Sequence, residues 1–242
     1  MDSLVLTALL EAVGVLAGVL LAFSIDAAWD NRRDRGREKG YLSALAAEIG
    51  TNRERFARYR DLLDGQLRTN DHALGDIVFG GPTVEAGSVR EWLRSTGALY
   101  LELPERAALS DILSSGGISF IEDPSVRRLI SRYSDALDRQ RTLQDSITMQ
   151  WNARFVPYTT QHASLYDMVC GVPWNDGWIA PDLGSFEDDI HAFVGNREFA
   201  NLIVHRSILI AMAREATGGL LAVIDQISAR VAKADDNSLL SG

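Results

Sequence analysis

The chain opens with an apolar run that is too long for an ordinary soluble helix. Between Leu4 and Ile25 one charged residue, Glu11, interrupts a segment made almost entirely of Leu, Val, Ala and Gly. About 20 consecutive apolar residues in a helix cross the hydrocarbon core of a bilayer. The sequence therefore predicts that residues 1–28 form a single transmembrane anchor.

A cleaved signal peptide is the alternative for this run. Signal peptides carry a basic n-region and a shorter apolar core, whereas residues 1–3 have no basic side chain and the run is roughly twice the usual core length. Residues 22–24 would make only a weak cleavage site. A retained anchor is the preferred interpretation.

The charges that flank the run indicate an orientation. Trp29 stands at the expected membrane boundary, and the basic side chains that follow are Arg32, Arg33, Arg35, Arg37 and Lys39. Basic residues favour the cytoplasmic side of a membrane. We therefore expect the C-terminal domain in the cytoplasm, with a periplasmic location as the alternative.

One face of the predicted span combines small residues with the carboxyl group. Gly14, Gly18 and Ala22 recur at helical spacing in line with Glu11, and a G-x-x-x-G pair lets two helices approach closely in lipid. A carboxylate facing lipid is costly, so Glu11 is expected at a helix interface or a water-filled path. Alternatively, Glu11 lies near the headgroups and is protonated or snorkels.

Five segments share a pattern with known proteins: Glu11–Ala22, Asp26–Arg32, Glu38–Leu45, Leu109–Gly116 and Ile121–Leu129. Over residues 9–135 they resemble a family of bacterial single-span membrane proteins of unknown function. In that family a span with an early Glu and a Gly-rich middle ends in a Trp-Asn-Glu-x-Arg signature, and a Tyr-Leu-x-x-Leu helix follows. The chain departs from the pattern with Asp30-Asn31 and with no basic leader. The resemblance implies a location in the bacterial plasma membrane and names no activity.

The remainder of the chain predicts an all-α protein. Apolar residues recur at spacings of three and four from Leu42 to Ile77, with Asn52, Gln66 and Asn70 on the same seam. No proline interrupts residues 26–79, so anchor and seam are expected to form one rod. Packing within the chain is slightly preferred to an intermolecular coiled coil.

Glycine and proline residues mark the boundaries between segments in the chain that follows the anchor. Residues 29–80 are assigned to a basic juxtamembrane segment and long helix, residues 81–235 to an antiparallel helical bundle, and residues 236–242 to a tail. Asp123-Pro124 predicts the start of a helix that reaches Trp151. If this helix packs against the first one, we expect the two to be antiparallel. The last long stripe, Phe199–Val231, is expected to be a core helix and not a second span.

Residues 152–184 break the helical pattern with three prolines, three glycines and several aromatic side chains. Long irregular loops in compact domains are often functional. The candidate partner or ligand residues are Tyr158, His162, Tyr166, Trp174 and Trp178. The alternative is that the tryptophans plug the open end of the bundle.

The sequence offers little catalytic chemistry. A net charge of −9 argues against a nucleic-acid partner. The histidines are scattered, and neither the acidic residues before His191 nor Cys170 with His162 makes a convincing metal or nucleophile site. Phosphate-binding and hydrolase motifs are missing. No cofactor, metal or catalytic residue is predicted.

The preferred function is therefore a membrane-anchored helical interaction protein, a scaffold or sensor, that forms a homo-oligomer through its span or contacts another membrane protein. The alternative is an oligomeric channel in which a ring of Glu11 side chains lines a path for ions or protons. A weaker third possibility is an anchored enzyme that uses the loop at residues 152–184.

Overall fold

The computed structural model describes residues 2–75, 79, 84–85, 87–89, 92–93, 99–164 and 189–240, with backbone alone for residues 2–13, 15, 190 and 233–240. Helices dominate this part of the chain, and it contains no strand. The prediction of an all-α protein is confirmed.

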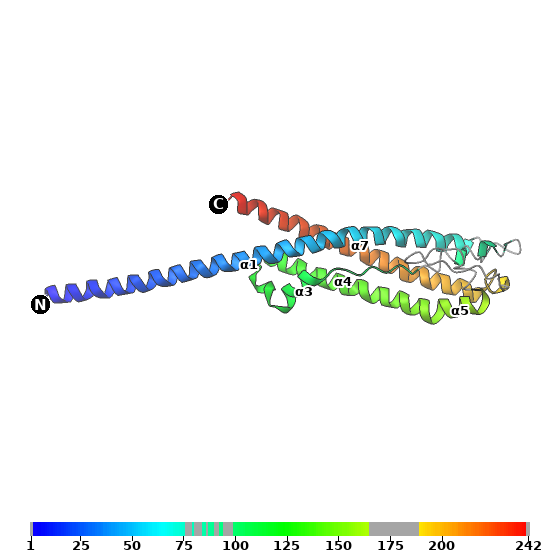
Figure 1. Cartoon of the computed structure of the whole chain (residues 1–242), viewed down its shortest axis with the longest axis horizontal. Coiled ribbons are helices and arrows are strands. Elements are labelled where there is room, and N and C mark those ends of the chain that lie inside the picture. Colours follow the sequence, from blue (N-terminus) through cyan, green and yellow to red (C-terminus); the bar gives the residue numbers. More distant parts are fainter. Residues whose placement is uncertain are drawn as a thin grey trace, which may run out of the picture.

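The longest element is α1 (Asp2–Ala73), a single helix of 72 residues. At 1.5 Å per residue it is about 110 Å long. Only its second half lies against other elements; the first half projects from the end of the molecule (Figure 1). The lack of proline across residues 26–73 allows this continuity.

The second long helix, α7 (Arg197–Leu240), runs antiparallel to α1. Arg53 Nε lies 2.8 Å from Asp225 Oδ1, whereas Asn70 Nδ2 donates to Ser207 Oγ at 3.0 Å. The partner numbers fall on α7 as they rise on α1, which fixes the antiparallel direction.

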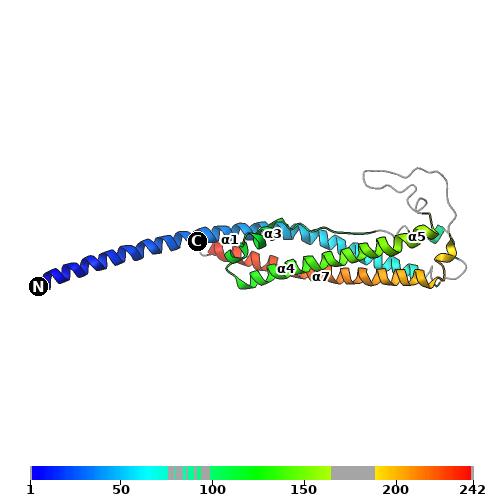
Figure 2. The ribbon, with the colours of Figure 1, turned by 90° about the horizontal axis from the view of Figure 1, so that it is seen from below.

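The third long helix, α4 (Pro124–Gln150), runs parallel to α1, so the predicted antiparallel direction is wrong. The Glu122 amide donates to Glu38 Oε1 at 2.7 Å, and Asn52 Nδ2 donates to Tyr133 Oη at 2.7 Å. The residue numbers of the contacting pairs therefore increase in the same direction along α1 and along the segment that leads into α4. The cause is an extended segment, residues 99–106, which carries the chain back toward the projecting half of α1 before α4 begins (Figure 2).

Short elements join this segment to α4. The helix α3 (Ala107–Ser114) and the 3₁₀ turn η2 (Gly117–Phe120) pack on α1. Gly116 separates them with a left-handed φ of 75°, which glycine adopts without strain. Asp123 then caps α4 by accepting from the Ser125 amide at 2.7 Å, as the Asp-Pro pair predicts.

The chain continues as helix beyond α4, so the predicted loop begins too early. A π turn, η3 (Trp151–Phe155), leads directly into α5 (Val156–His162). Proline lacks an amide donor and clashes in an ordinary helix interior. The wider π turn ends at Phe155, two residues before Pro157, and the helical geometry changes there. Residues 165–188 of the predicted loop lie outside the described residues.

The main core lies between α1, α4 and α7, and α7 contributes a strict heptad pattern. Its buried positions that follow the three-four spacing are Phe199, Ile203, Arg206, Ile210, Ala213, Thr217, Leu220, Ile224, Ile227 and Val231, and Val223 is buried beside them. Among residues with described side chains, Arg197–Ala232 is the one helical segment long and apolar enough to cross a membrane. Its buried stripe packs along the other two long helices, as expected of a core helix.

Candidate functional site

The extended segment 99–106, called the strap below, occupies the groove between α1 and α4. Buried amide side chains hold its backbone from both helices. Asn52 of α1 donates to the Glu105 carbonyl at 2.7 Å and accepts from the Glu105 amide at 2.9 Å. Gln144 of α4 donates to the Glu102 carbonyl at 3.0 Å and accepts from the Glu102 amide at 3.2 Å. The two amides replace the partner strand that an extended backbone normally needs.

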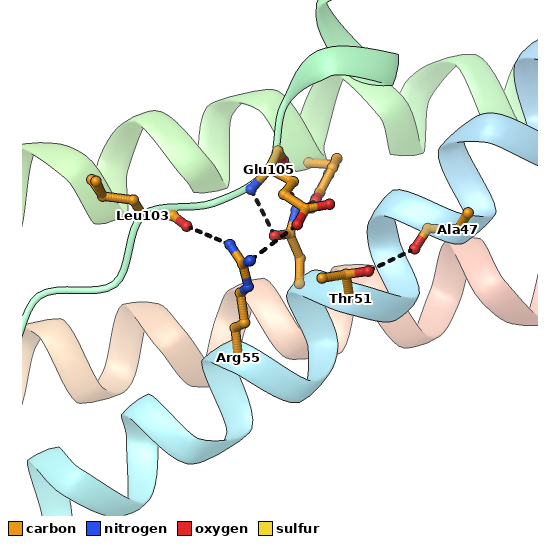
Figure 3. Close-up of polar contacts among 7 residues, drawn as sticks. Ala47, Thr51, Arg55, Leu103 and Glu105 are labelled. Atoms are coloured by element: carbon orange, nitrogen blue, oxygen red, sulfur yellow. Dashed lines mark hydrogen bonds and ion pairs between the residues drawn. The ribbon is translucent and has the colours of Figure 1, made fainter.

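Charged side chains reinforce the strap at its edges. Arg55 donates to the Leu103 carbonyl at 3.3 Å, and its Nη2 lies 3.0 Å from Glu105 Oε1 (Figure 3). On the other side Arg106 Nη1 lies 2.7 Å from Asp138 Oδ1 of α4. The strap therefore connects the two parallel helices, which make few direct contacts with each other.

The side chains of α1 and α4 that bind the strap are called the clamp below, and Glu48 of α1 extends it to the start of α3. Its carboxylate accepts from the Ala108 amide at 2.6 Å and from the Leu109 amide at 3.4 Å. The N-cap residue of α3 is Arg106, which supplies no side-chain cap, so α1 provides the acceptor that the local sequence lacks. Burial raises the pKa of Glu48, opposed by these two hydrogen bonds.

Residues 115–122 fix the place where α1 leaves the bundle. Tyr41 stacks on Phe120 with ring centroids 6.5 Å apart, and its hydroxyl lies 3.2 Å from Ser115 Oγ. A Cβ on Gly117 would come within 2.9 Å of Tyr41 Cζ, so only glycine fits this close approach. Arg37, one turn nearer the chain start, lies over the Phe120 ring at 4.9 Å.

Polar groups also occupy the centre of the bundle. Tyr59 and Gln140 lie one heptad beyond Asn52 and Tyr133, and both are buried. Neither the Tyr59 hydroxyl nor the two polar atoms of the Gln140 amide has a hydrogen-bond partner among the described residues. Burial also raises the pKa of the Tyr59 phenol above its ordinary range. A buried polar atom is costly unless it is hydrogen-bonded, so this layer is a direct test of what such atoms contribute to stability.

The predicted partner loop splits between described and undescribed residues. Tyr158 and His162 lie on α5 and belong to a packed aromatic cluster with Phe193 and Phe199. The Tyr158 hydroxyl donates to the Ala192 carbonyl of the 3₁₀ turn η5 (Ile190–Ala192) at 2.5 Å. These two side chains therefore help to close the end of the bundle. Tyr166, Trp174 and Trp178 lie outside the described residues.

The predicted span residues stand apart from this clamp. Gly14 and Gly18 have open space around a hypothetical Cβ, and Ala22 is exposed. The Glu11 side chain is not among those described. The boundary residues Trp29, Arg32, Arg33, Arg35 and Arg37 are all exposed. Arg35 reaches toward Glu122, with 3.8 Å between Nε and Oε1, so the basic segment also touches the bundle.

The strap is the feature that the sequence did not reveal. Asn52 was predicted to lie on a helical seam, and the structure shows that its side chain binds the backbone of Glu105. Gln144, which binds the strap from α4, and Glu48, which caps α3, were not identified from the sequence. The available signal was an extended Leu-Glu-Leu-Pro stretch, residues 101–104, between two helical seams that carry buried amides.

The described residues contain no group of three His, Cys, Asp or Glu side chains placed to hold a metal ion. Comparison with protein-family models, curated proteins and solved structures found no match to this chain. The arrangement itself is that of a clamped helical bundle carried by a long projecting helix.

Proposed function

We propose that the protein is a membrane-anchored helical scaffold or sensor, in which α1 inserts its first turns into a bilayer and holds the bundle at a set distance from it. The observation that carries this proposal is the exposed apolar surface of the projecting half of α1. Its large exposed side chains include Leu16, Val19, Leu20, Leu21, Phe23 and Ile25. In water such a surface would promote aggregation. In lipid, an apolar surface is what a membrane-spanning helix is expected to have.

The end of the apolar surface supports the same proposal. Trp29 is 73% exposed and directly follows the apolar run, at the position where indole rings favour a membrane interface. The basic residues 32–39 come next. By the charge rule the bundle would face the cytoplasm, and by the resemblance to single-span bacterial proteins the membrane would be the plasma membrane.

The helix itself supports a scaffold or sensor role. Because α1 passes from the apolar segment into the bundle core without a break, a rotation or tilt of the anchor would move Tyr41, Glu48 and Asn52 directly. Tyr41 stacks on Phe120 of η2, Glu48 binds the start of α3, and Asn52 binds the strap. Leu101 and Leu103 of the strap are exposed to solvent, so a partner that binds them would respond to a displacement of the strap.

Membrane extraction tests the anchor. The full-length chain should remain with the membrane through an alkaline wash and be released only by detergent. Replacing Leu16, Leu20 and Phe23 with Lys should move the chain to the aqueous fraction, because each charge is costly in hydrocarbon. Recovery of the unaltered chain from the aqueous fraction would refute the proposal.

A matched control separates lipid insertion from general loss of apolar surface. The triple variant Val204→Lys, Ile208→Lys and Met212→Lys removes three exposed apolar side chains from α7. It should stay with the membrane. A reporter fused after Gly242 then determines which side of the membrane the bundle occupies.

A further inference from the structure

The outer face of α7 carries apolar side chains that the bundle does not use. Val204, Ile208 and Met212 follow one another at intervals of four residues and are 44%, 53% and 46% exposed. They lie opposite the buried stripe that includes Ile203 and Ile210. This second apolar face explains why α7 is hydrophobic enough to pass for a span. A helix with apolar residues all round is normally covered on every side.

A pair of glycines extends this face. Gly218 and Gly219 lie inside α7, where each glycine is unfavourable relative to alanine. A Cβ at either position would meet no atom within 4 Å. Packing within the described residues therefore does not require these glycines, whereas close approach of another surface would.

A groove beside Gly219 carries both signs of charge. It lies between α4 and α7, has a volume of about 370 Å³ and is lined by Arg132, Asp135, Ala136, Arg139, Glu215, Ala216, Gly219 and Leu220. Two bases and two acids thus share one short stretch. Neither Arg139 nor Glu215 has an ion-pair partner among the described residues. A surface with balanced charge of this kind is complementary to itself.

We propose that a second copy of this chain docks on the α7 face and the adjoining α4 groove. The two α7 helices lie side by side in the same direction, with Ile208 against the partner's Ile208. Glu215 of each copy faces the partner's Arg139 across the groove. The parallel direction rests on the proposed membrane anchor, because two copies in one membrane must share the direction of their long axes.

The size of the surface fits an association that depends on the anchor. From Arg197 to Ala222 the face is about 38 Å long. A strip of this length and one helix width is smaller than the roughly 800 Å² per partner of a standard stable interface. Confinement of both copies to the membrane raises their effective concentration and compensates for this deficit. Self-association should therefore be stronger in vesicles than in dilute detergent.

Disulfide trapping tests the interface in the full-length chain. In a Cys170→Ser background, Asn201→Cys and Ile208→Cys should each form a disulfide-linked dimer in vesicles of neutral phospholipid. Arg68→Cys, an exposed position on α1, is the matched control and should stay monomeric. Dimers at position 208 and none at position 201 would overturn the parallel arrangement, because an antiparallel pair centred on Ile208 separates the two Asn201 residues.

Charge reversal tests the pairing across the groove. Glu215→Arg alone and Arg139→Glu alone should each weaken self-association about tenfold, since attraction becomes repulsion at two symmetric places. The double variant should restore it to within about threefold. Arg68→Glu on α1 is the control and should leave it unchanged. Equal weakening in the single and double variants would refute the predicted pair.

The results separate this inference from the anchor. A chain that remains in the membrane but gives no disulfide at positions 201 and 208 retains its anchor and lacks this interface. A chain that forms both disulfides but appears in the aqueous fraction has the interface without the anchor. Monomers at every position would mean that this face is covered by another segment of the chain or by a different protein.

Discussion

The two halves of α1 have opposite relations to their surroundings. Between residues 16 and 25 the helix turns large apolar side chains outward, with Phe23 67% exposed. Between residues 45 and 73 the same helix buries its seam, and Asn52, Gln66 and Asn70 lie inside the bundle. One half is apolar outside and the other is partly polar inside.

This difference shows that residue polarity alone does not locate a core. Buried amides are tolerated where they find backbone partners, as Asn52 does on the strap. Exposed leucines on the projecting half are explained by lipid, on the proposed function. The predictions below test each half separately, beginning with the largest effect.

Asn52→Leu should destabilise the bundle most. It leaves the amide and carbonyl of Glu105 without their acceptor and donor and removes a donor from Tyr133. We expect a loss of about 3 kcal/mol in the free energy of unfolding, measured by urea denaturation in detergent. The neighbouring Thr51→Ala, whose hydroxyl bonds only within its own helix, is the control and should cost less than about 0.5 kcal/mol.

Two glutamines one turn apart on α4 should respond in opposite directions. Gln144→Leu removes both hydrogen bonds to Glu102 and should cost about 2 kcal/mol. Gln140→Leu removes an amide with no partner among the described residues and should add about 1 kcal/mol. Destabilisation by Gln140→Leu would indicate a partner for this amide, for example bound water.

Gly219→Ala should stabilise the monomeric chain by about 1 kcal/mol, because the helix gains propensity and the added Cβ meets open space. Unfolding of dilute protein, followed by circular dichroism, measures this gain. Gly117→Ala is the contrasting variant and should be destabilising, because its Cβ would collide with Tyr41.

The raised pKa of Glu48 predicts a pH dependence of stability. The folded chain holds the proton more tightly than the unfolded chain, so this residue's contribution to stability falls as pH rises from the ordinary glutamate pKa through the raised value. Comparing Glu48→Gln with the unaltered chain between about pH 4 and pH 7 isolates this component. The difference should favour the unaltered chain most at the acidic end. An identical pH dependence in both proteins would contradict it.

Leu20→Ala should have the smallest effect on folding. This side chain is exposed and touches no part of the bundle, so the free energy of unfolding should change by less than about 0.5 kcal/mol. Its effect should instead appear as weaker retention in the membrane fraction. The buried Leu45→Ala is the matched change in the other half of α1, and it should cost at least about 2 kcal/mol.

Sequence periodicity predicted the helices well because each long helix buries a stripe with spacings of three and four. The buried stripe on α7 includes Arg206, and the helix continues without a break past Gly218 and Gly219, since packing along the whole stripe outweighs the low helix propensity of these two residues. The cap at Asp123 was predictable because it depends on only three consecutive residues.

The direction of α4 and the clamp on the strap were not predictable from periodicity. Direction depends on where the chain goes between the two helices, and the strap, residues 99–106, has no heptad pattern and only a short alternation of leucines that names no partner. The contacts of Asn52 and Gln144 join residues 53 and 42 positions apart. Long-range pairing of this kind leaves no local pattern in a single sequence.

Because α1 is continuous, the number of residues between Trp29 and Glu38 sets the rotation of the bundle about the helix axis. One residue inserted between Trp29 and Glu38 would turn everything beyond it by about 100° and advance it by about 1.5 Å. Seven inserted residues would nearly restore the original phase, about 10 Å further out. Adding or removing residues in that stretch would therefore set the direction in which the bundle faces relative to the proposed anchor.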